Sequence, residues 1–257
     1  MNISTSERLK RRLRFIAPLE LFTMDDIIRK DDSPMAVNKE LNRMLSKGEL
    51  GKLKKGIYFI PEKSRFGILT PSSIQITKFL TRKNNKITGY ISGQTIHNRL
   101  GLTTQVPATI TIAIPEIRRS GEFANLKIKY IKAYGEIKEK NIPILQLLDT
   151  INSIKKVSDS IISISLSRLK LIISKLPYQE QLILIEQAKH YPPMVKALVG
   201  LLLSNIWFNK PDYLKNLNTL KNSIRKSTRF YFNIGNIDLV NKEEWNINDT
   251  ARTHRRI

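Results

Sequence analysis

The amino-acid sequence predicts an α+β fold in three parts. Two short amphipathic helices and a lysine-rich hairpin occupy residues 21–61. Two stretches in which apolar residues alternate with other residues, 109–114 and 126–133, indicate strands in a mixed segment, and helices separated by prolines follow residue 158. The expected domains are an N-terminal unit at 1–63, a central mixed α/β domain at 64–157 and a mainly helical C-terminal region at 158–257.

The two N-terminal helices have clear start signals. Thr23 followed by Asp26 is a helix-capping pattern, because both side chains satisfy free backbone amides, and it places the first start at Met24. An acidic pair ends this helix. Ser33-Pro34 then supplies a second N-cap and a residue whose fixed φ suits the first helical position, and the helix runs to about Ser46.

The second helix has one apolar face and one small, amidic and basic face. Its apolar positions are Val37, Leu41, Met44 and Leu45. The other face suits nucleic acid, because amides pair with adenine, arginine pairs with guanine and lysine meets phosphate. The candidate DNA-binding residues of this segment are Ser33, Ala36, Asn38, Lys39, Asn42 and Arg43.

A basic hairpin follows. Leu50–Leu53 and Ile57–Ile60 are its expected strands, and its candidate phosphate contacts are Lys52, Lys54 and Lys55. Two helices and then a basic hairpin predict a winged helix-turn-helix, which lays its second helix in the major groove of DNA. The alternative is an ordinary small α+β unit whose charges only solvate it.

An opening helix is expected over Glu7–Ile16, with Leu9, Leu13 and Ile16 on its apolar face. Its arginines, among them Arg11 and Arg12, either follow the DNA backbone or only solvate the helix.

The central segment mixes helices and strands. We expect a helix after Thr70-Pro71, a polar loop at 82–86, and a short helix that Ser92 caps and Gly101 closes. Prolines at 107 and 115 bound the strand Thr109–Ile114, which suits a short strand or one near a sheet edge. The remaining expected elements are a strand at 126–133 and a helix from Pro143 through Ile151.

Prolines separate the helices expected in the C-terminal region, which form a small bundle packed against the central domain or a dimer-forming surface. The helices are Ile161–Lys175, Tyr178–His190, Met194–Ile206 and Asp212 to about Lys226, and a strand is expected at Arg229–Gly235. The basic tail from Asp249, with Arg252, His254, Arg255 and Arg256, is expected to be disordered.

The charge balance points to a polyanionic partner. The chain has 44 Lys and Arg against 22 Asp and Glu, a formal charge of +22. Part of this excess is also what a compositional bias of a whole proteome would produce.

The sequence contains no cysteine, so disulfides and thiolate zinc sites are excluded, and a reducing cytoplasm fits. The first residues lack the pattern of a signal peptide, and no apolar run is long enough to span a membrane.

Catalytic and metal-binding signals are weak. His97, His190 and His254 are far apart in the sequence, and no tight carboxylate cluster or glycine-rich phosphate loop is present. Ser92 and Thr95 are conceivable nucleophiles, but no base or orienting acid accompanies them, and capping a helix better explains Ser92. We expect neither an enzyme nor a cofactor or metal.

Two segments resemble a known family. KLKKGIYFIPEKSRFG, Lys52–Gly67, and GYISGQTIHNRLGLTTQVPATITIAIP, Gly89–Pro115, are similar to bacterial antitoxins of the AbiEi type, from type IV abortive-infection toxin-antitoxin systems. The resemblance implies a repressor of its own operon, with the DNA-reading helix at Ser33–Ser46 and the wing at Lys52–Ile60. It also implies a second domain associated with antitoxin action, and a nucleotidyltransferase-like toxin that is counteracted without a stable direct complex.

The leading hypothesis is a cytoplasmic DNA-binding autorepressor and antitoxin in phage defence. Its partner is double-stranded DNA at its own operator, and dimerisation fits because repressors often occupy paired half-sites. One alternative is a nucleic-acid-processing enzyme that a winged helix delivers to its substrate. Another is a ligand-sensing transcriptional regulator unrelated to a toxin.

Overall fold

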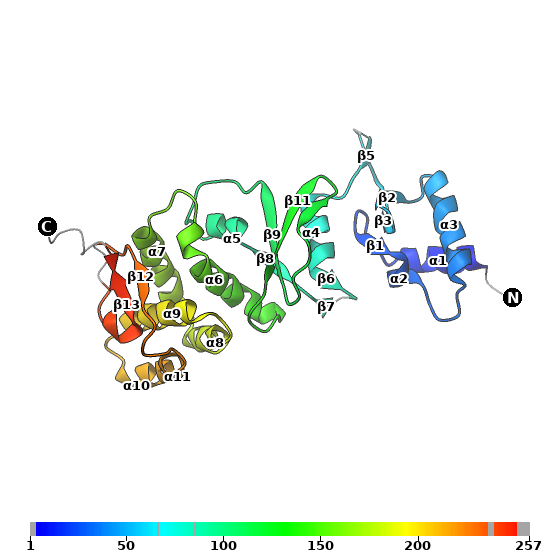
Figure 1. Ribbon diagram of the computed structural model, residues 1–257. Helices are drawn as coiled ribbons and strands as arrows, with labels where there is room; N and C mark the ends of the chain where they lie inside the picture. Colours follow the sequence, from blue (N-terminus) through cyan, green and yellow to red (C-terminus); the bar gives the residue numbers. More distant parts are fainter. Residues whose placement is uncertain (1–3, 66, 85, 236–238, 251–257) are drawn as a thin grey trace. The chain divides into compact units, whose positions relative to one another are not determined.

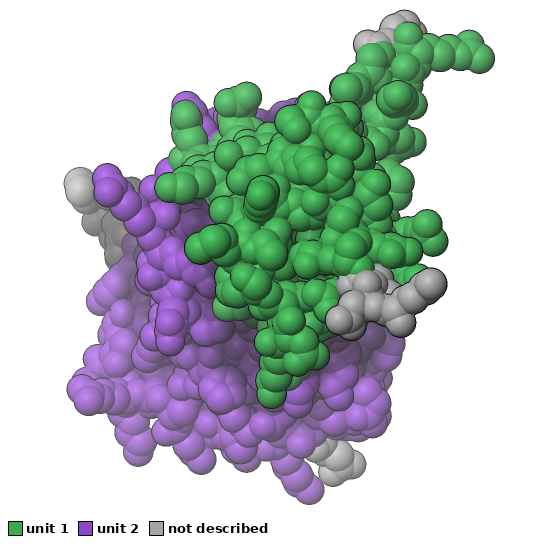
Figure 2. All heavy atoms as spheres, turned by 90° about the vertical axis from the view of Figure 1, so that its right-hand side faces the viewer, with its two compact units in different colours: residues 1–88, 122–126 green, residues 89–121, 127–257 purple. Residues whose placement is uncertain are grey.

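The computed structural model describes residues 4–65, 67–84, 86–235 and 239–250, which adopt a mixed α+β fold as expected from the sequence (Figure 1). The chain forms two compact units, residues 1–88 with 122–126 and residues 89–121 with 127–257 (Figure 2). The predicted domain ranges divide the chain differently. Hydrophobic cores explain the difference, because residues after 63 pack with the N-terminal elements and the helices after 158 share a core with the central sheet.

Unit 1 begins with helices and a three-stranded antiparallel sheet of order β1-β3-β2. Its first elements are α1 (Thr5–Leu13), β1 (Leu21–Thr23), α2 (Met24–Ile27), α3 (Pro34–Ser46), β2 (Gly51–Lys54) and β3 (Ile57–Phe59). The predicted helix starts at Met24 and Pro34 are confirmed. Strand β1 was not expected, because a three-residue strand has no measurable period and forms only by pairing Leu21 with Phe59.

The helices of unit 1 enclose a small core. Val37 and Leu41 on α3 are fully buried, and they pack with Leu9 and Leu13 of α1, so the predicted apolar faces of both helices are confirmed. Helix α1 begins at Thr5 rather than at the predicted Glu7, because Ser4 accepts a hydrogen bond from the Glu7 N–H at 3.3 Å. It ends at Leu13 rather than at Ile16.

The rest of unit 1 contains two further hairpins and a helix. These elements are β4 (Glu62–Ser64), β5 (Gly67–Leu69), α4 (Ser73–Thr81), β6 (Arg82–Lys83) and β7 (Lys86–Ile87). The predicted polar loop at 82–86 is therefore wrong as to type, because residues 82–83 and 86–87 pair as antiparallel strands. Ser72 and Gln75 form a capping box, which starts α4 at Ser73, and Ile76 buries against Phe59.

Unit 2 contains a sheet in which β11 (Leu126–Lys132), β9 (Thr109–Ile114) and β8 (Tyr90–Ser92) lie in that order. Strand β9 is an interior strand, parallel to β11 and antiparallel to β8, and β8 forms an edge of the sheet, so β9 lies near an edge as expected. Both flanking prolines lie outside the paired residues 109–114, and the missing N–H groups interrupt no ladder. Strand β10 (Gly121–Phe123) precedes β11, and residues 122–126, which include most of β10 and the first residue of β11, belong to unit 1.

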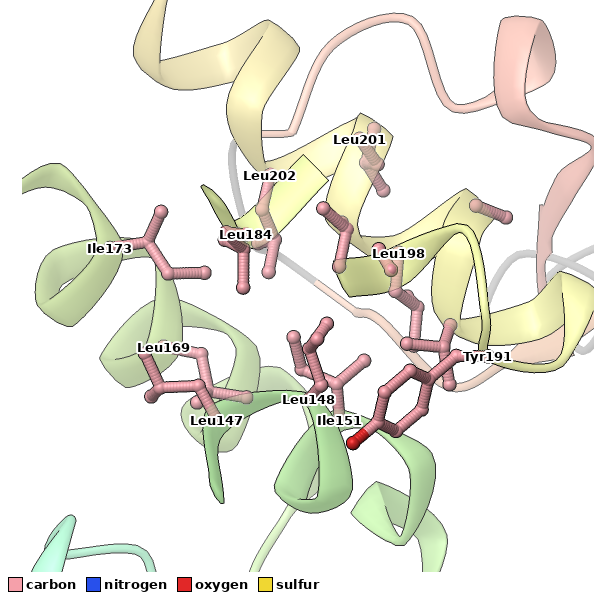
Figure 3. Packing of buried hydrophobic residues seen from close by; sticks show 14 of the residues in the cluster. Leu147, Leu148, Ile151, Leu169, Ile173, Leu184, Tyr191, Leu198, Leu201 and Leu202 are labelled. Atoms are coloured by element: carbon pink, nitrogen blue, oxygen red, sulfur yellow. The ribbon is translucent and has the colours of Figure 1, made fainter. Parts of the chain in front are cut away.

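Helices converge on one large core in unit 2. They are α5 (Gln94–Arg99), α6 (Ile142–Asn152), α7 (Ile162–Ser174), α8 (Tyr178–Ala188) and α9 (Pro193–Ile206). Figure 3 shows side chains of α6, α7, α8 and α9 meeting, among them Leu148, Leu169, Leu184 and Leu198, each fully buried. The proline-separated helices are confirmed, and they share one core with the central sheet, as the predicted bundle packed against the central domain would.

The C-terminal elements are short. They are α10 (Pro211–Leu214), a 3-10 turn at Lys215–Leu217, α11 (Asn218–Asn222), β12 (Phe230–Phe232), a 3-10 turn at Glu243–Trp245 and β13 (Ile247–Asp249). The single helix predicted from Asp212 is thus divided, and the predicted strand at 229–235 is shorter and pairs with β13 in parallel. The disordered tail was expected to begin at Asp249, but Asp249 ends β13, where it pairs with Phe232, and only residues 251–257 of the predicted tail lie outside the described residues.

Ser92 does not cap a helix. Gly93, with φ 65°, occupies the N-cap position of α5, and Ser92 lies at the end of β8. Its buried hydroxyl donates to Asp149 Oδ2 at 2.8 Å, and Tyr191 donates to Asp149 Oδ1 at 2.8 Å. Burial raises the pKa of Asp149, while both hydroxyl hydrogen bonds act to lower it. These bonds tie the sheet to α6 and to Tyr191, three residues after the end of α8, which the sequence pattern did not indicate.

Each helix in the described part of the chain falls short of the length or apolarity that a bilayer crossing needs.

A close contact between α9 and Trp245 provides a test of the unit 2 core. A Cβ atom added at Gly200 would lie 2.1 Å from the Trp245 ring. We therefore expect Gly200→Ala to lower the free energy of unfolding by about 1–3 kcal/mol, although the same change in a free helix stabilises by about 1 kcal/mol. Urea unfolding followed by tryptophan fluorescence measures this. Gly121→Ala is the control, because no atom lies within 4 Å of its Cβ position, and an equal loss in both variants would contradict the packing.

Candidate nucleic-acid interface

Helix α3 exposes a continuous polar surface because its apolar side is sealed in the core. Asn38, Lys39 and Asn42 are exposed, and in the described part of the chain their side chains form no hydrogen bond or ion pair. Ser33 is also exposed, whereas Ala36 is half-buried. Ser33 occupies the N-cap position, but its hydroxyl makes no capping hydrogen bond to α3. Most of the residues predicted at this helix are therefore exposed on α3 or at its N-cap.

Met35 is a member of this surface that the sequence analysis missed. Its side chain is 83% exposed, although methionine is usually buried. Residues at 35, 38, 39 and 42 have the i, i+3, i+4, i+7 spacing of a single helical stripe. That spacing was a signal that could have identified Met35. We call Met35, Asn38, Lys39 and Asn42 the polar stripe of α3.

Arg43 is exposed but already has a partner. Its Nε donates to Glu40 Oε2 at 2.8 Å and its Nη2 donates to Glu40 Oε1 at 2.5 Å. Nη2 also donates to Ser6 Oγ at 3.0 Å, which joins α3 to α1. The hydrogen bonds from Arg43 lower the pKa of Glu40 to about 2. Arg43 would therefore have to break its two hydrogen bonds to the Glu40 carboxylate before it could contact a base.

The two predicted arginines of α1 differ. Arg11 is exposed and lies 3.7 Å from Glu7, as an i, i+4 pair. Arg12 is partly buried, and it pairs with Asp32 and donates to the Ile27 carbonyl at 2.9 Å. This arrangement gives Arg12 a structural role in joining α1 to the turn before α3, and we remove it from the candidate interface.

Asp32 is the acceptor at the centre of this junction. Its side chain is 1% exposed, and it receives Arg12, Arg8 at 3.5 Å, and the backbone N–H of Arg29 at 3.0 Å. The hydrogen bond from Arg12 is the main reason that the pKa of Asp32 lies below its ordinary value. Asp32 was predicted only to end a helix. A buried acid surrounded by donors cannot be distinguished from an exposed one by sequence alone.

The β2–β3 hairpin carries the other predicted cations. Gly56, with φ 77°, forms its turn, and Lys52, Lys54 and Lys55 are exposed. Lys54 Nζ lies 5.6 Å from the ring centroid of Phe123, which in turn lies 6.3 Å from the ring of Phe79. The two aromatic rings pack against the hairpin and support it. A helix with free amides beside a basic hairpin offers groups for base edges and for phosphates.

The histidines and candidate nucleophiles do not assemble a second site in the described residues. His97 is buried, with Nε2 3.0 Å from Ser153 Oγ, and burial lowers its pKa. Thr95 is half-buried on α5, and His254 lies outside the described residues. Where the structure describes the chain, no three His, Cys, Asp or Glu side chains are grouped as metal ligands.

Comparison with known proteins gives a family and a fold. A family model described as "Family of unknown function (DUF6088)" matches residues 11–164, more than half of the chain. No curated protein matches. The crystal structure of the RV2827C protein from Mycobacterium tuberculosis is similar, with a TM-score of 0.50 and 12% identity, over 97% of this chain and 92% of that chain. At this identity the likeness shows the fold alone.

The Asp32 junction predicts how unit 1 depends on pH. We expect Asp32→Asn to lower the free energy of unfolding by about 2 kcal/mol at pH 7, because charged hydrogen bonds are lost. Since the folded-state pKa is lowered from 3.8, the carboxylate stabilises fully above that pH and loses its effect as the pH falls below it. The difference in stability between the variant and the natural protein should therefore narrow as the pH is lowered below 3.8 in urea unfolding followed by circular dichroism.

The neighbouring exposed acid provides the control for this test. Asp31→Asn removes the same charge one residue away without disturbing the junction. An equal loss of stability in the two variants would show that the local charge, and not the buried contacts of Asp32, is responsible.

Proposed function

Within DUF6088, the family to which this chain belongs, we propose that the protein is a DNA-binding transcriptional autorepressor and the antitoxin of a type IV toxin-antitoxin system. The observation that carries the DNA-binding part is the polar stripe of α3, whose amide and lysine side chains are exposed and free of partners within the described residues. Helices α2 and α3 followed by the β2–β3 hairpin have the order of a winged helix-turn-helix.

Each part of this surface has a separate task in the proposal. Asn38 and Asn42 pair with base edges in the major groove, Met35 contacts thymine methyl groups, and Lys39 meets phosphate. Lys52 and Lys55 on the hairpin also meet phosphate, and Arg11 lies along the backbone. Arg43 joins the base contacts when it exchanges Glu40 for guanine. The total charge of +22 favours this polyanionic partner.

The antitoxin part rests on the resemblance of Gly89–Pro115 to AbiEi-type antitoxins. In the structure this segment forms β8, α5 and β9, and β9 is an interior strand of its sheet. We propose that unit 2 provides the antitoxin function against a nucleotidyltransferase-like toxin, without a stable complex and without catalysis or a cofactor. The protein would act in the cytoplasm, and a homodimer would match paired operator half-sites.

Two experiments test the two parts. Footprinting on the DNA upstream of its own gene should show a protected site, and a scrambled sequence should not be protected. Expression of an adjacent nucleotidyltransferase-like gene alone should arrest growth, and co-expression of the present protein should restore it. Protection without rescue would retain the repressor and reject the antitoxin.

Base and phosphate contacts predict different mutant behaviour. We expect Asn42→Ala to reduce the preference for operator over scrambled DNA by about 5- to 150-fold, the effect of losing one bidentate base contact. Lys55→Ala should weaken binding to both DNAs equally and reduce the slope of log affinity against log salt by about 1. Fluorescence anisotropy titrations over a salt series measure both quantities. Equal losses on both DNAs in the Asn42 variant would contradict base contact.

The pairing of Arg43 with Glu40 predicts that removing the Glu40 charge will tighten binding to operator DNA. Glu40→Gln frees Arg43 and removes a negative charge from α3, so we expect tighter operator binding in the same titration. Glu49→Gln removes an equal charge from the pair with Lys10 and should have a smaller effect. In an Arg43→Ala background the gain from Glu40→Gln should disappear, apart from the general charge effect that Glu49→Gln measures. A gain that persists in full would show that Arg43 plays no part.

A further inference from the structure

The β4–β5 hairpin projects from unit 1 as a narrow ribbon (Figures 1 and 2). Its strands Glu62–Ser64 and Gly67–Leu69 pair antiparallel, with Ser64 opposite Gly67, and Ser64 Oγ donates to the Gly67 carbonyl at 3.0 Å. Nearly every described residue of the hairpin is exposed. A two-stranded ribbon without a covered face is marginally stable alone, so this shape is unexplained by packing within unit 1.

The exposed side chains of the hairpin are both cationic and apolar. Lys63 and Arg65 are exposed and have no acidic partner among the described residues. Ile68 is 63% exposed and Leu69 is 40% exposed. Cations that meet phosphate together with aliphatic groups that fit between bases are the combination used by proteins that contact the minor groove of DNA.

The position of the hairpin in the chain selects DNA as its partner. Only two residues separate Phe59, the end of β3, from Glu62, the start of β4. Arg65 lies six residues after Phe59, a reach of at most about 20 Å at about 3.3 Å per residue. Half a turn of B-DNA is about 17 Å. A duplex held by α3 and the β2–β3 hairpin therefore has its neighbouring groove within reach of Lys63 and Arg65.

We propose that the β4–β5 hairpin is a second DNA-contacting ribbon, which enters the minor groove beside the major groove occupied by α3. Lys63 and Arg65 bind phosphates along the groove edges, and Ile68 contacts the sugars and base edges. This inference rests on the proposed DNA-binding function, and it extends the operator contact by one groove. The hairpin then gains its covered face only on DNA.

The test compares two pairs of basic residues, each on a different hairpin of unit 1. The variant Lys63→Ala with Arg65→Ala removes the proposed contacts. The control Lys83→Ala with Lys86→Ala removes two exposed charges from the β6–β7 hairpin. Both are made in the full chain, and thermal unfolding should be unchanged because the altered side chains are exposed. Hydroxyl-radical footprinting on the operator, which reports the minor groove, and salt-dependent titrations are the readouts.

We expect the β4–β5 variant to lose protection in one flanking minor groove while the protection due to α3 and the preference over scrambled DNA remain. Its affinity should fall at least tenfold, and its salt slope should fall by about 2, the loss of two phosphate contacts. Ile68→Ser should weaken the same flanking protection without changing the salt slope. The control pair should keep the full footprint.

The outcomes separate the two proposals. A normal operator footprint that the β4–β5 variant leaves intact overturns the second ribbon and retains the repressor. An equal loss of affinity in the control pair also overturns it, since bulk charge would then explain the effect. An absence of any footprint for the natural protein overturns the proposed function itself.

Discussion

The burial of one side of α3 is the constraint on which the rest of unit 1 depends. Val37 and Leu41 have no exposed surface, and each contributes about 1.5–3 kcal/mol of transfer free energy. A rotation of α3 about its axis would expose them, so the helix has one permitted orientation. That orientation fixes Asn38 and Asn42 outward. The proposed recognition surface is therefore a direct consequence of core packing.

Charged groups in unit 1 fall into two sets. Asp32 collects Arg12 and Arg8 into a junction that holds α1 against the turn before α3, and this junction uses cations that the composition alone would assign to a nucleic acid. Lys39, Lys52 and Lys55 stay exposed and available. Arg43 lies between the two sets, because it is exposed and yet pairs with Glu40. Net charge thus overstates the number of cations that can reach a partner.

Unit 1 is completed by residues distant in sequence. The segment 122–126 belongs to unit 1, and Phe123 packs with Phe79 behind the basic hairpin, close to Lys54. A hairpin of two short strands needs such support to hold a defined shape. Phe123 lies 44 residues after Phe79 and 69 residues after Lys54 in the sequence, and no local pattern reports their contact. It also explains why the units do not follow the linear divisions of the chain.

The sequence by itself determined the elements with strong local signals. Capping residues and apolar spacing located α3, the alternation at Thr109–Ile114 located β9, and prolines located the helices after residue 158, because backbone dihedrals and hydrogen bonds over a few residues decide these features. Only the tertiary structure decided that β9 is interior, that Ser92 bonds to Asp149, that Arg12 pairs with Asp32 and that Met35 is exposed. Each of these features depends on which surfaces come into contact in the folded chain. The free energy of that contact depends on residues from segments that are distant in sequence, so no single stretch predicts it.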